Sequence, residues 1–166
     1  MKNNSERFDC LAVGKYYSLT DHLDSVRLFM DKANQTTSFA VRCPTPEERL
    51  LRAKLIYEEC METIEALGVD HILGKFVDAG EENYDPIAVL DGACDIAVVT
   101  NGTLIACGLD GAFPEALERV DNNNLSKFGE GSYLREDGKV MKPPNYVPVY
   151  LHDLVTYMKD SDGNCY

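Results

Sequence analysis

The sequence predicts an all-α protein: a bundle of roughly four to five helices, followed by an irregular C-terminal segment that contains a hairpin. Before residue 121, apolar residues recur at helical spacing, in stretches that begin and end at residues typical of helix termini. From residue 121 to residue 150 the chain is rich in Asn, Gly, Pro and Tyr, which favours loops. The 45% of hydrophobic residues in this 166-residue chain are sufficient for one core.

The first helix is expected over residues 20–35. Thr20 and Asp21 form a suitable N-cap pair, and apolar side chains follow at i, i+3 and i+4 spacing. The expected core positions are Leu23, Val26, Phe29 or Met30, and Ala33.

The second helix is expected to be longer than the first. Thr45 can cap it, Pro46 suits its first turn, and it runs to about Leu67, where Gly68 stops it. The following residues, 69–84, are expected to form a short helical or irregular connection.

The third helix is expected from Pro86 to Leu109. Asp91 and Asp95 are its only charged residues, so the stretch is apolar enough to suggest a membrane span. Placing two carboxylates in the centre of a bilayer is costly, and several glycines interrupt the stretch. We therefore expect a buried bundle helix and no membrane.

A fourth helix is expected around residues 114–120, where PEALERV has good helix formers after a proline. A hairpin is expected around residues 135–139, because Asp-Gly favours a tight turn. A short closing helix is expected within residues 149–162. The predicted organisation is an N-terminal extension (1–19), one domain (20–158) and a polar tail (159–166).

The composition limits the function classes. With 28 acidic and 16 basic side chains the net charge is −12, which argues against a protein that binds a nucleic-acid polymer through a basic surface. Free nucleotides remain compatible, because a metal ion can supply positive charge. The N-terminus, MKNNSERFDC, lacks the apolar region of a secretory signal, so a cytoplasmic location is expected. The six scattered cysteines are expected to be buried, reduced thiols.

Acidic residues form a stripe on the expected second helix. At about 100° per residue, Glu58, Glu62 and Glu65 lie within roughly 60° of arc, and Glu59 flanks them. A solvated face is the ordinary interpretation of such a run. Here, however, the same face is apolar one turn earlier and the opposite face is apolar too, which indicates a helix inside a bundle.

Asp91 and Asp95 are spaced i, i+4 and share one face of the apolar third helix. Buried carboxylates need a partner, which could be a core side chain such as Arg49, Arg52 or Tyr57. Alternatively, the acids of both helices converge on one metal site. Oxygen ligands without histidine or thiol suit Mg²⁺, with Mn²⁺ as a second choice, and Mg²⁺ commonly bridges to substrate phosphates.

These residues resemble a known family, the all-α nucleoside triphosphate pyrophosphohydrolases of the MazG-like and phosphoribosyl-ATP pyrophosphohydrolase-like group. The family hallmark is E-E-x-x-E on one helix and E-x-x-D on the next. Residues 58–62 (EECME) reproduce the first part, and Asp95 stands at the Asp of the second. Gly92 replaces the Glu of that second part, so the resemblance implies that Asp91 substitutes for it.

Further segments carry the resemblance over about residues 20–150. LFMDKANQ (28–35) looks like the first helix of the family, and LDGACDIAVVTNGTLIACGLD (90–110) looks like the D-x-x-x-D helix of its phosphoribosyl-ATP-like branch. NLSK (124–127) and REDGKVMKPPNY (135–146) resemble the N-x-S-K and R-x-D-G-K-x-x-K-x-P-x-Y tail of that branch.

The resemblance implies hydrolysis of a nucleoside triphosphate between its α and β phosphates, giving a monophosphate and pyrophosphate. It implies that Mg²⁺ is held by carboxylates of two helices, and that one of them also positions or deprotonates the attacking water. The implied metal ligands are Glu58, Glu59, Glu62, Asp91 and Asp95, with Glu58 as the catalytic residue. The implied substrate-binding residues are Asn34, Gln35, Asn124, Lys127, Lys139, Lys142 and Tyr146.

The resemblance also implies a homodimer or a dimer of dimers. Three alternatives remain open at this point: a phosphoribosyl-ATP pyrophosphohydrolase, a non-catalytic nucleotide-binding module of the same fold, and an acidic mimic of nucleic acid. The mimic predicts acids spread over an outer face, whereas the enzyme predicts acids that converge between helices.

Overall fold

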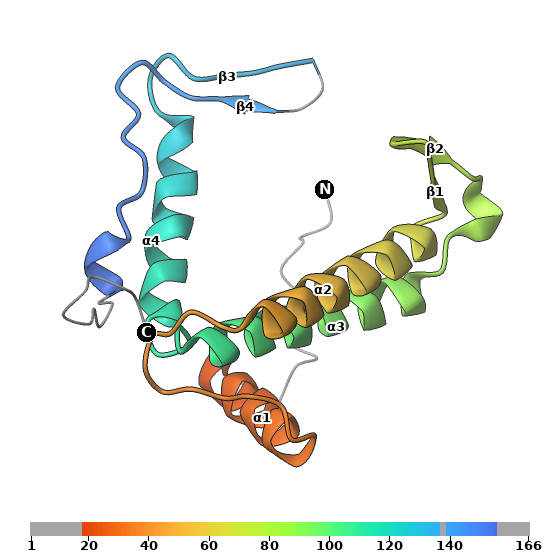
Figure 1. Ribbon diagram of the computed structural model, residues 1–166. Coiled ribbons are helices and arrows are strands. Elements are labelled where there is room, and N and C mark those ends of the chain that lie inside the picture. Colours follow the sequence, from red (N-terminus) through yellow and green to blue (C-terminus); the bar gives the residue numbers. More distant parts are fainter. Residues whose placement is uncertain (1–17, 137–138, 156–166) are drawn as a thin grey trace, which may run out of the picture.

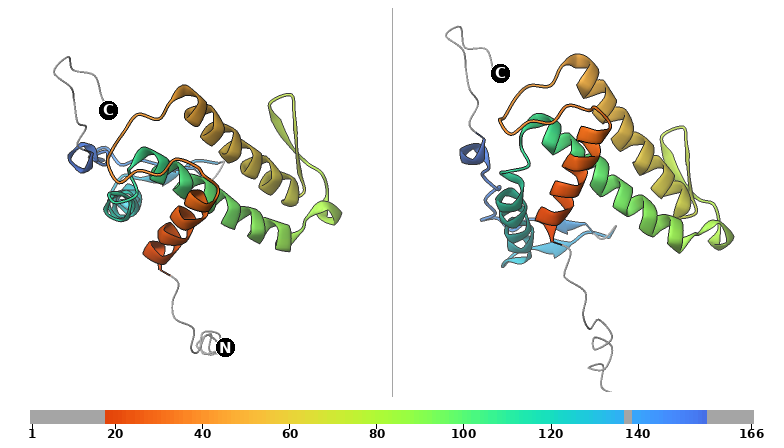
Figure 2. Two further views of the ribbon diagram at one scale, coloured as in Figure 1. Left: turned by 60° about the horizontal axis from the view of Figure 1, so that its bottom comes forward. Right: turned by 90° about the horizontal axis from the view of Figure 1, so that it is seen from below.

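The computed structural model describes residues 18–136 and 139–155. It is 58% helical, with four helices and two small sheets, which confirms the expected helical class. Helices α2 (Pro46–Ala66) and α3 (Pro86–Cys107) lie side by side and antiparallel, and α1 (Leu19–Lys32) packs against α3 (Figures 1 and 2). Helix α4 (Phe113–Leu125) stands apart from the α2 and α3 pair.

Capping residues set where the first two helices begin. Ser18, and not the expected Thr20 and Asp21 pair, is the N-cap of α1; its hydroxyl accepts from the backbone N–H of Asp21, whose carboxylate accepts in return. In α2, Thr45 forms the same reciprocal arrangement with Glu48. The predicted start and end of α2 are confirmed.

Helix α3 begins after Asp85, whose carboxylate accepts from two backbone N–H groups of the first turn. It ends at Cys107, because Gly108 adopts φ 68°. A Cβ atom at Gly108 would overlap the carbonyl of Ala40, so the chain that follows α1 passes directly over this helix end.

The loop from residue 33 to residue 45 is held on the C-terminal turn of α3. The backbone N–H of Ser38 donates to Ile105 O, and that of Arg42 donates to Cys107 O, both at 3.0 Å. The Arg42 guanidinium also donates to Ala106 O at 3.1 Å. These bonds satisfy carbonyls that a helix end leaves without partners.

The prediction of a short helical or irregular connection over residues 69–84 is wrong. Residues in this range form an antiparallel hairpin of β1 (Val69–Ile72) and β2 (Lys75–Asp78), followed by the 3-10 turn η2 (Glu81–Asn83). Leu73 and Gly74, between the strands, both have positive φ, 52° and 78°. That conformation is typical of tight hairpin turns, but Leu at the first position gives little sequence signal for it.

The C-terminal hairpin is confirmed by two short antiparallel strands, β3 (Tyr133–Leu134) and β4 (Val140–Met141). Its expected Asp-Gly turn, 137–138, lies outside the described residues. Helix α4 extends beyond the predicted residues 114–120 at both ends and continues into the 3-10 turn η3 (Ser126–Phe128). Of the expected closing helix, the structure describes only the 3-10 turn η4 (His152–Leu154), and residues beyond 155 lie outside it.

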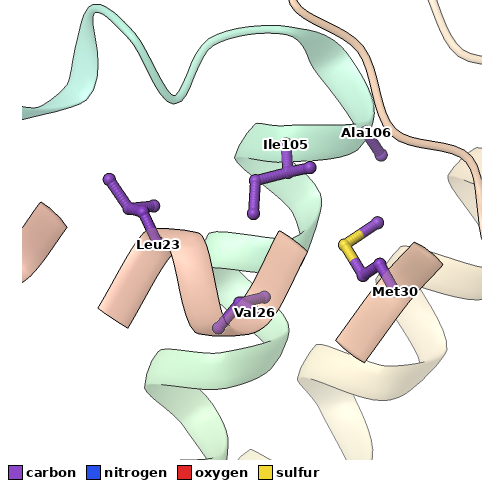
Figure 3. Close-up of a cluster of buried hydrophobic side chains, with 5 residues drawn as sticks. All are labelled: Leu23, Val26, Met30, Ile105 and Ala106. Atoms are coloured by element: carbon purple, nitrogen blue, oxygen red, sulfur yellow. The ribbon is translucent and has the colours of Figure 1, made fainter. Parts of the chain in front are cut away.

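The core of the described residues lies between α1 and α3 (Figure 3). It contains Leu23, Val26 and Met30 from α1 and Ile105 and Ala106 from α3. The sequence left open whether Phe29 or Met30 belongs to the core. Met30 is buried, whereas the side chain of Phe29 is 60% exposed. The expected core position Ala33 is exposed and caps the helix instead.

The cysteines of the described residues are free thiols, as predicted. Cys43 and Cys94 are exposed, which corrects the expectation that the thiols are buried; Cys60 and Cys107 are partly buried. Cys10 and Cys165 lie outside the described residues.

Acid should destabilise the start of α2. Arg42 Nη2 donates to Glu48 at 2.7 Å, and this bond is the largest cause that lowers the pKa of Glu48 to about 2, from 4.5. A carboxyl group with a lowered folded-state pKa stabilises the fold above its unfolded-state pKa and loses that contribution as pH falls. We expect the midpoint of thermal unfolding to fall between pH 4.5 and about 2, and to fall less in Glu48→Gln.

Thermal unfolding followed by circular dichroism across that pH window tests this prediction. Glu65→Gln is the matched control, because Glu65 is exposed on the same helix and forms no ion pair in the described residues. Parallel pH profiles for wild type and Glu48→Gln would contradict the role of the Arg42 contact.

Candidate functional site

Two buried glycines of α3 allow close contact with α2. A Cβ atom at Gly92 would overlap Thr63 Oγ1, and one at Gly102 would lie 3.2 Å from Arg52 Nη1. These contacts fix the antiparallel register of the two helices. Between these two glycine contacts, Glu59 of α2 and Asp95 of α3 line the same cavity.

The cavity between α1, α2 and α3 has a volume of about 260 Å³. Its polar lining residues are Gln35, Arg52, Glu59 and Asp95. Apolar side chains form most of the remaining wall: Val26, Phe29, Met30, Leu55, Val98 and Val99. The cavity therefore has carboxylates and a guanidinium connected by an apolar surface, an arrangement typical of small-molecule sites.

Negative charge surrounds Glu59. Its pKa is raised first by partial removal from water and then by Asp95, Glu62, Glu58 and Asp91, in that order. Glu59 and Asp95 are half-buried, while the other three are exposed. Four of the five acids that the sequence singled out thus act on the fifth, Glu59, from both helices.

None of these five carboxylates forms an ion pair or hydrogen bond with another side chain in residues 18–136 and 139–155. The core partners considered for Asp91 and Asp95 are engaged elsewhere or point outward. Arg49 donates to Cys43 and to the carbonyl of Pro44, Arg52 donates to Gln35, and Tyr57 is 62% exposed.

The donor set fits a hard divalent cation such as Mg²⁺, because it consists of carboxylate oxygens that form no ion pair with a cationic side chain in the described residues. Within the described residues, no three or more acidic, histidine or cysteine side chains are already arranged to hold an ion. Mutual repulsion of unpaired carboxylates favours such a separated arrangement. An ion would therefore have to draw the carboxylates together.

Arg52 is a site residue that the sequence reasoning did not assign to substrate. Its side chain is buried, at 7% exposure, and its Nη2 donates to Gln35 Oε1 at 2.8 Å. An arginine within an amphipathic helix carries no special sequence signal. Only the contact with Gly102 and the position of the 33–45 loop reveal that it lies at the cavity.

Of the two residues that the resemblance implies at the substrate, Gln35 lines this cavity and Asn34 does not. Asn34 is exposed with φ 53° and lines a second cavity of about 180 Å³, beside Glu48, Gln35 and Arg52. The two cavities share Gln35 and Arg52.

The predicted substrate-binding residues of the tail form a separate group. Lys127 Nζ donates to Asn124 Oδ1 at 2.6 Å, and Lys142 Nζ lies 4.4 Å from the centre of the Tyr146 ring. Tyr146 donates to Asn123 and lines a cavity of about 570 Å³ beside α4. Lys139 lies just before β4 and is exposed.

In the described part of the chain, neither α4 nor the β3–β4 hairpin packs extensively against α2 or α3 (Figure 1). Asn124, Lys127, Lys139, Lys142 and Tyr146 are therefore not brought to Glu59 and Asp95 within a single chain. The sequence could not show this, because the segment order of the resemblance contains no information about how the tail is oriented.

The sequence matches no protein-family model and no curated protein. The resemblance to all-α pyrophosphohydrolases rests on the motifs quoted above.

Proposed function

We propose that the protein is a Mg²⁺-dependent nucleoside triphosphate pyrophosphohydrolase that cleaves between the α and β phosphates. The observation that supports this best is a single cavity lined by Glu59 and Asp95, one from each motif helix, and by apolar side chains. The half-buried pair of Glu59 and Asp95, one from each helix, also favours an enzyme over a nucleic-acid mimic, which would spread its acids over an outer surface.

The proposed roles follow from position. Glu59 and Asp95 line the cavity, and Glu62 and Asp91 add negative charge beside them, so these four would hold Mg²⁺. The bound ion supplies stabilisation of the charge that develops on the phosphate oxygens. Glu58, on the same helix and exposed, would accept the proton of the attacking water. The apolar wall would exclude water from the nucleoside.

The test is release of pyrophosphate from a panel of canonical and modified nucleotides, with phosphoribosyl-ATP included, in Mg²⁺, in Mn²⁺ and in EDTA. We expect metal-dependent release with a monophosphate product. Activity on phosphoribosyl-ATP alone would replace the general nucleotide substrate by that one. If no nucleotide is hydrolysed with either metal, the proposed function is wrong and the fold serves as a binding module.

We further propose that the chain acts as a homodimer or a dimer of dimers. By length and composition α3 is the one described helix that could span a membrane, a test that core helices of soluble proteins also pass. Only 17% of its apolar stretch is buried within the single chain, and Ile87 and Leu90 are 80% and 68% exposed. A second copy of the chain would cover this exposed apolar surface of α3.

The cytoplasmic location stays a prediction.

Sedimentation at micromolar concentration should therefore give a dimer or tetramer. Leu90→Glu should shift the protein toward monomer and lower its activity, because a charge would be buried in the interface. Leu73→Glu is the matched control, since Leu73 is 97% exposed at the tip of the β1–β2 hairpin. A fully active monomeric wild type would exclude the dimer proposal.

A further inference from the structure

The Arg52 side chain is buried without an anionic partner. It is 7% exposed, its one hydrogen bond within the described residues goes to the neutral amide of Gln35, and it forms no ion pair there. A buried cation without an anion or several acceptors is unfavourable. The remaining N–H donors of this guanidinium are therefore available to acceptor atoms of a ligand in the cavity it lines.

The Arg52 contact also fixes the orientation of the Gln35 amide. Arginine has no acceptor atom, so the Gln35 atom that receives its hydrogen bond must be the carbonyl oxygen. Gln35 Nε2, which makes no hydrogen bond in the described part of the chain, is then left as a donor. Because Arg52 already engages Gln35 Oε1, the polar groups of these two side chains that have no partner in the described residues are N–H donors.

The two ends of the cavity have opposite chemistry. Arg52 and Glu59 are seven residues apart on α2, and Gly102, which Arg52 contacts, is seven residues from Asp95 on α3, so two helical turns separate the Arg52 and Gln35 pair from the two acids along the cavity. Val26 and Met30, which also belong to the core in Figure 3, contribute to the apolar wall. The volume of about 260 Å³ is close to the roughly 300 Å³ lower end for whole small-ligand pockets. This volume suits a base and a sugar, and the triphosphate would then leave the cavity beside Glu59 and Asp95.

We infer that Arg52 and Gln35 read the nucleobase, and that they select bases with two adjacent acceptor atoms. Guanine offers O6 and N7, and cytosine offers O2 and N3. Adenine places its N6 amino donor beside each acceptor of its accessible edges, so a donor on the protein would face a donor on the base. This inference rests on the proposed function for the direction in which the nucleotide lies.

The experiment compares kcat/KM for dGTP, dCTP and dATP. We expect dGTP, dCTP or both to exceed dATP by about 10- to 100-fold, the range for a bidentate base contact. 7-deaza-dGTP, which lacks the N7 acceptor, should lose most of any guanine preference. Hydrolysis of dATP as efficient as that of dGTP and dCTP would overturn the inference.

Two variants test the residues. Arg52→Met should reduce the discrimination to within about threefold, mainly through KM for the preferred base. Gln35→Glu keeps an acceptor for Arg52 but replaces the Nε2 donor by an acceptor. It should therefore raise kcat/KM for dATP relative to the values for dGTP and dCTP. Arg49→Met, which removes a guanidinium from the exposed side of the same helix, is the control.

Circular dichroism is used to check whether each variant is folded. If Arg52→Met does not fold, the Gln35→Glu result decides alone. Unchanged base preference in the folded variants would overturn the inference.

Binding measurements separate this inference from the proposed function. Calorimetric titration with dGMP, dCMP and dAMP needs no hydrolysis. Selective binding of dGMP or dCMP that Gln35→Glu reverses, without pyrophosphate release from any triphosphate, supports the base-reading pair and rejects the enzyme. Pyrophosphate release from all nucleotides, without selectivity in binding or in rate, supports the enzyme and rejects the base-reading pair.

Discussion

Glu59→Gln and Asp95→Asn are each expected to lower metal-dependent pyrophosphate release by about 100-fold or more, the effect of removing a group that stabilises transition-state charge. Both side chains line the cavity, and both replacements keep the shape of the side chain while removing its charge. The measurement is initial rate in Mg²⁺ and in Mn²⁺ for each variant. If both variants retain wild-type rates, the metal site has been assigned to the wrong residues.

The same variants should not weaken the fold in EDTA. The raised pKa of Glu59 means that partial removal from water, and then repulsion by neighbouring acids, disfavours its ionised form in the folded protein. Glu59→Gln relieves both effects, and Asp95→Asn removes the strongest of the repelling charges. The wild-type midpoint of thermal unfolding should rise with Mg²⁺ or Mn²⁺, and those of the two variants should not. Glu65→Gln, on the same helix, is the matched control and should behave as wild type in both assays.

Gly92→Glu, which would restore the family acid, is expected to destabilise the protein by about 3 kcal/mol or more, because it overpacks the contact between the two helices. Gly92 is buried, and a Cβ atom there would overlap Thr63 Oγ1 and lie 3.2 Å from Thr63 Cβ. Activity should fall as well, because the Glu59 and Asp95 register depends on this contact. The residue is thus a packing residue at a place where the resemblance implies a ligand.

Gly92→Ala isolates the steric effect from the charge. Alanine favours helix over glycine by about 1 kcal/mol, yet the overlap should leave a net loss of about 1 kcal/mol. Adding Thr63→Ala should recover most of the lost free energy of unfolding. Urea unfolding of the single and double variants measures this free energy. Gly111→Ala is the control, because no atom lies within 4 Å of a Cβ there. Additive effects of the two substitutions would contradict a direct contact.

Local signals allowed the helices to be predicted well. Thr45, Pro46 and Gly68 bound α2 as expected, and α3 begins at Pro86 as expected. The ends of α3 and α1 were placed too late: α3 ends at Cys107 and not at Leu109, and α1 ends at Lys32 and not at residue 35. The β1–β2 hairpin was missed because its turn places Leu73, an unusual residue for positive φ, at the first position. Short-range chemistry thus predicts element ends where capping residues follow their preferences, and it fails where they do not.

The candidate site was predictable only in part. Motif spacing singled out Glu59 and Asp95, and the resemblance added Gln35; all three line one cavity. Arg52 was not assigned because its role depends on the register between α2 and α3, which Gly92 and Gly102 set through contacts far apart in the sequence. The lysines of the tail are separate from the acids in a single chain for the same reason: no local pattern determines how α4 is placed.

Gln35 lies in the 33–45 loop. Backbone hydrogen bonds from Ser38 and Arg42 attach this loop to the C-terminal turn of α3. Such a segment can open with a much smaller free energy than the whole protein needs to unfold. Each opening would withdraw the Gln35 amide from Arg52 while α2 and α3 stay paired. Native-state hydrogen exchange at the amides of Ser38 and Arg42 therefore reports how often the guanidinium end of the cavity is exposed to solvent. Their exchange rates should slow when a nucleotide occupies the cavity and holds the loop closed.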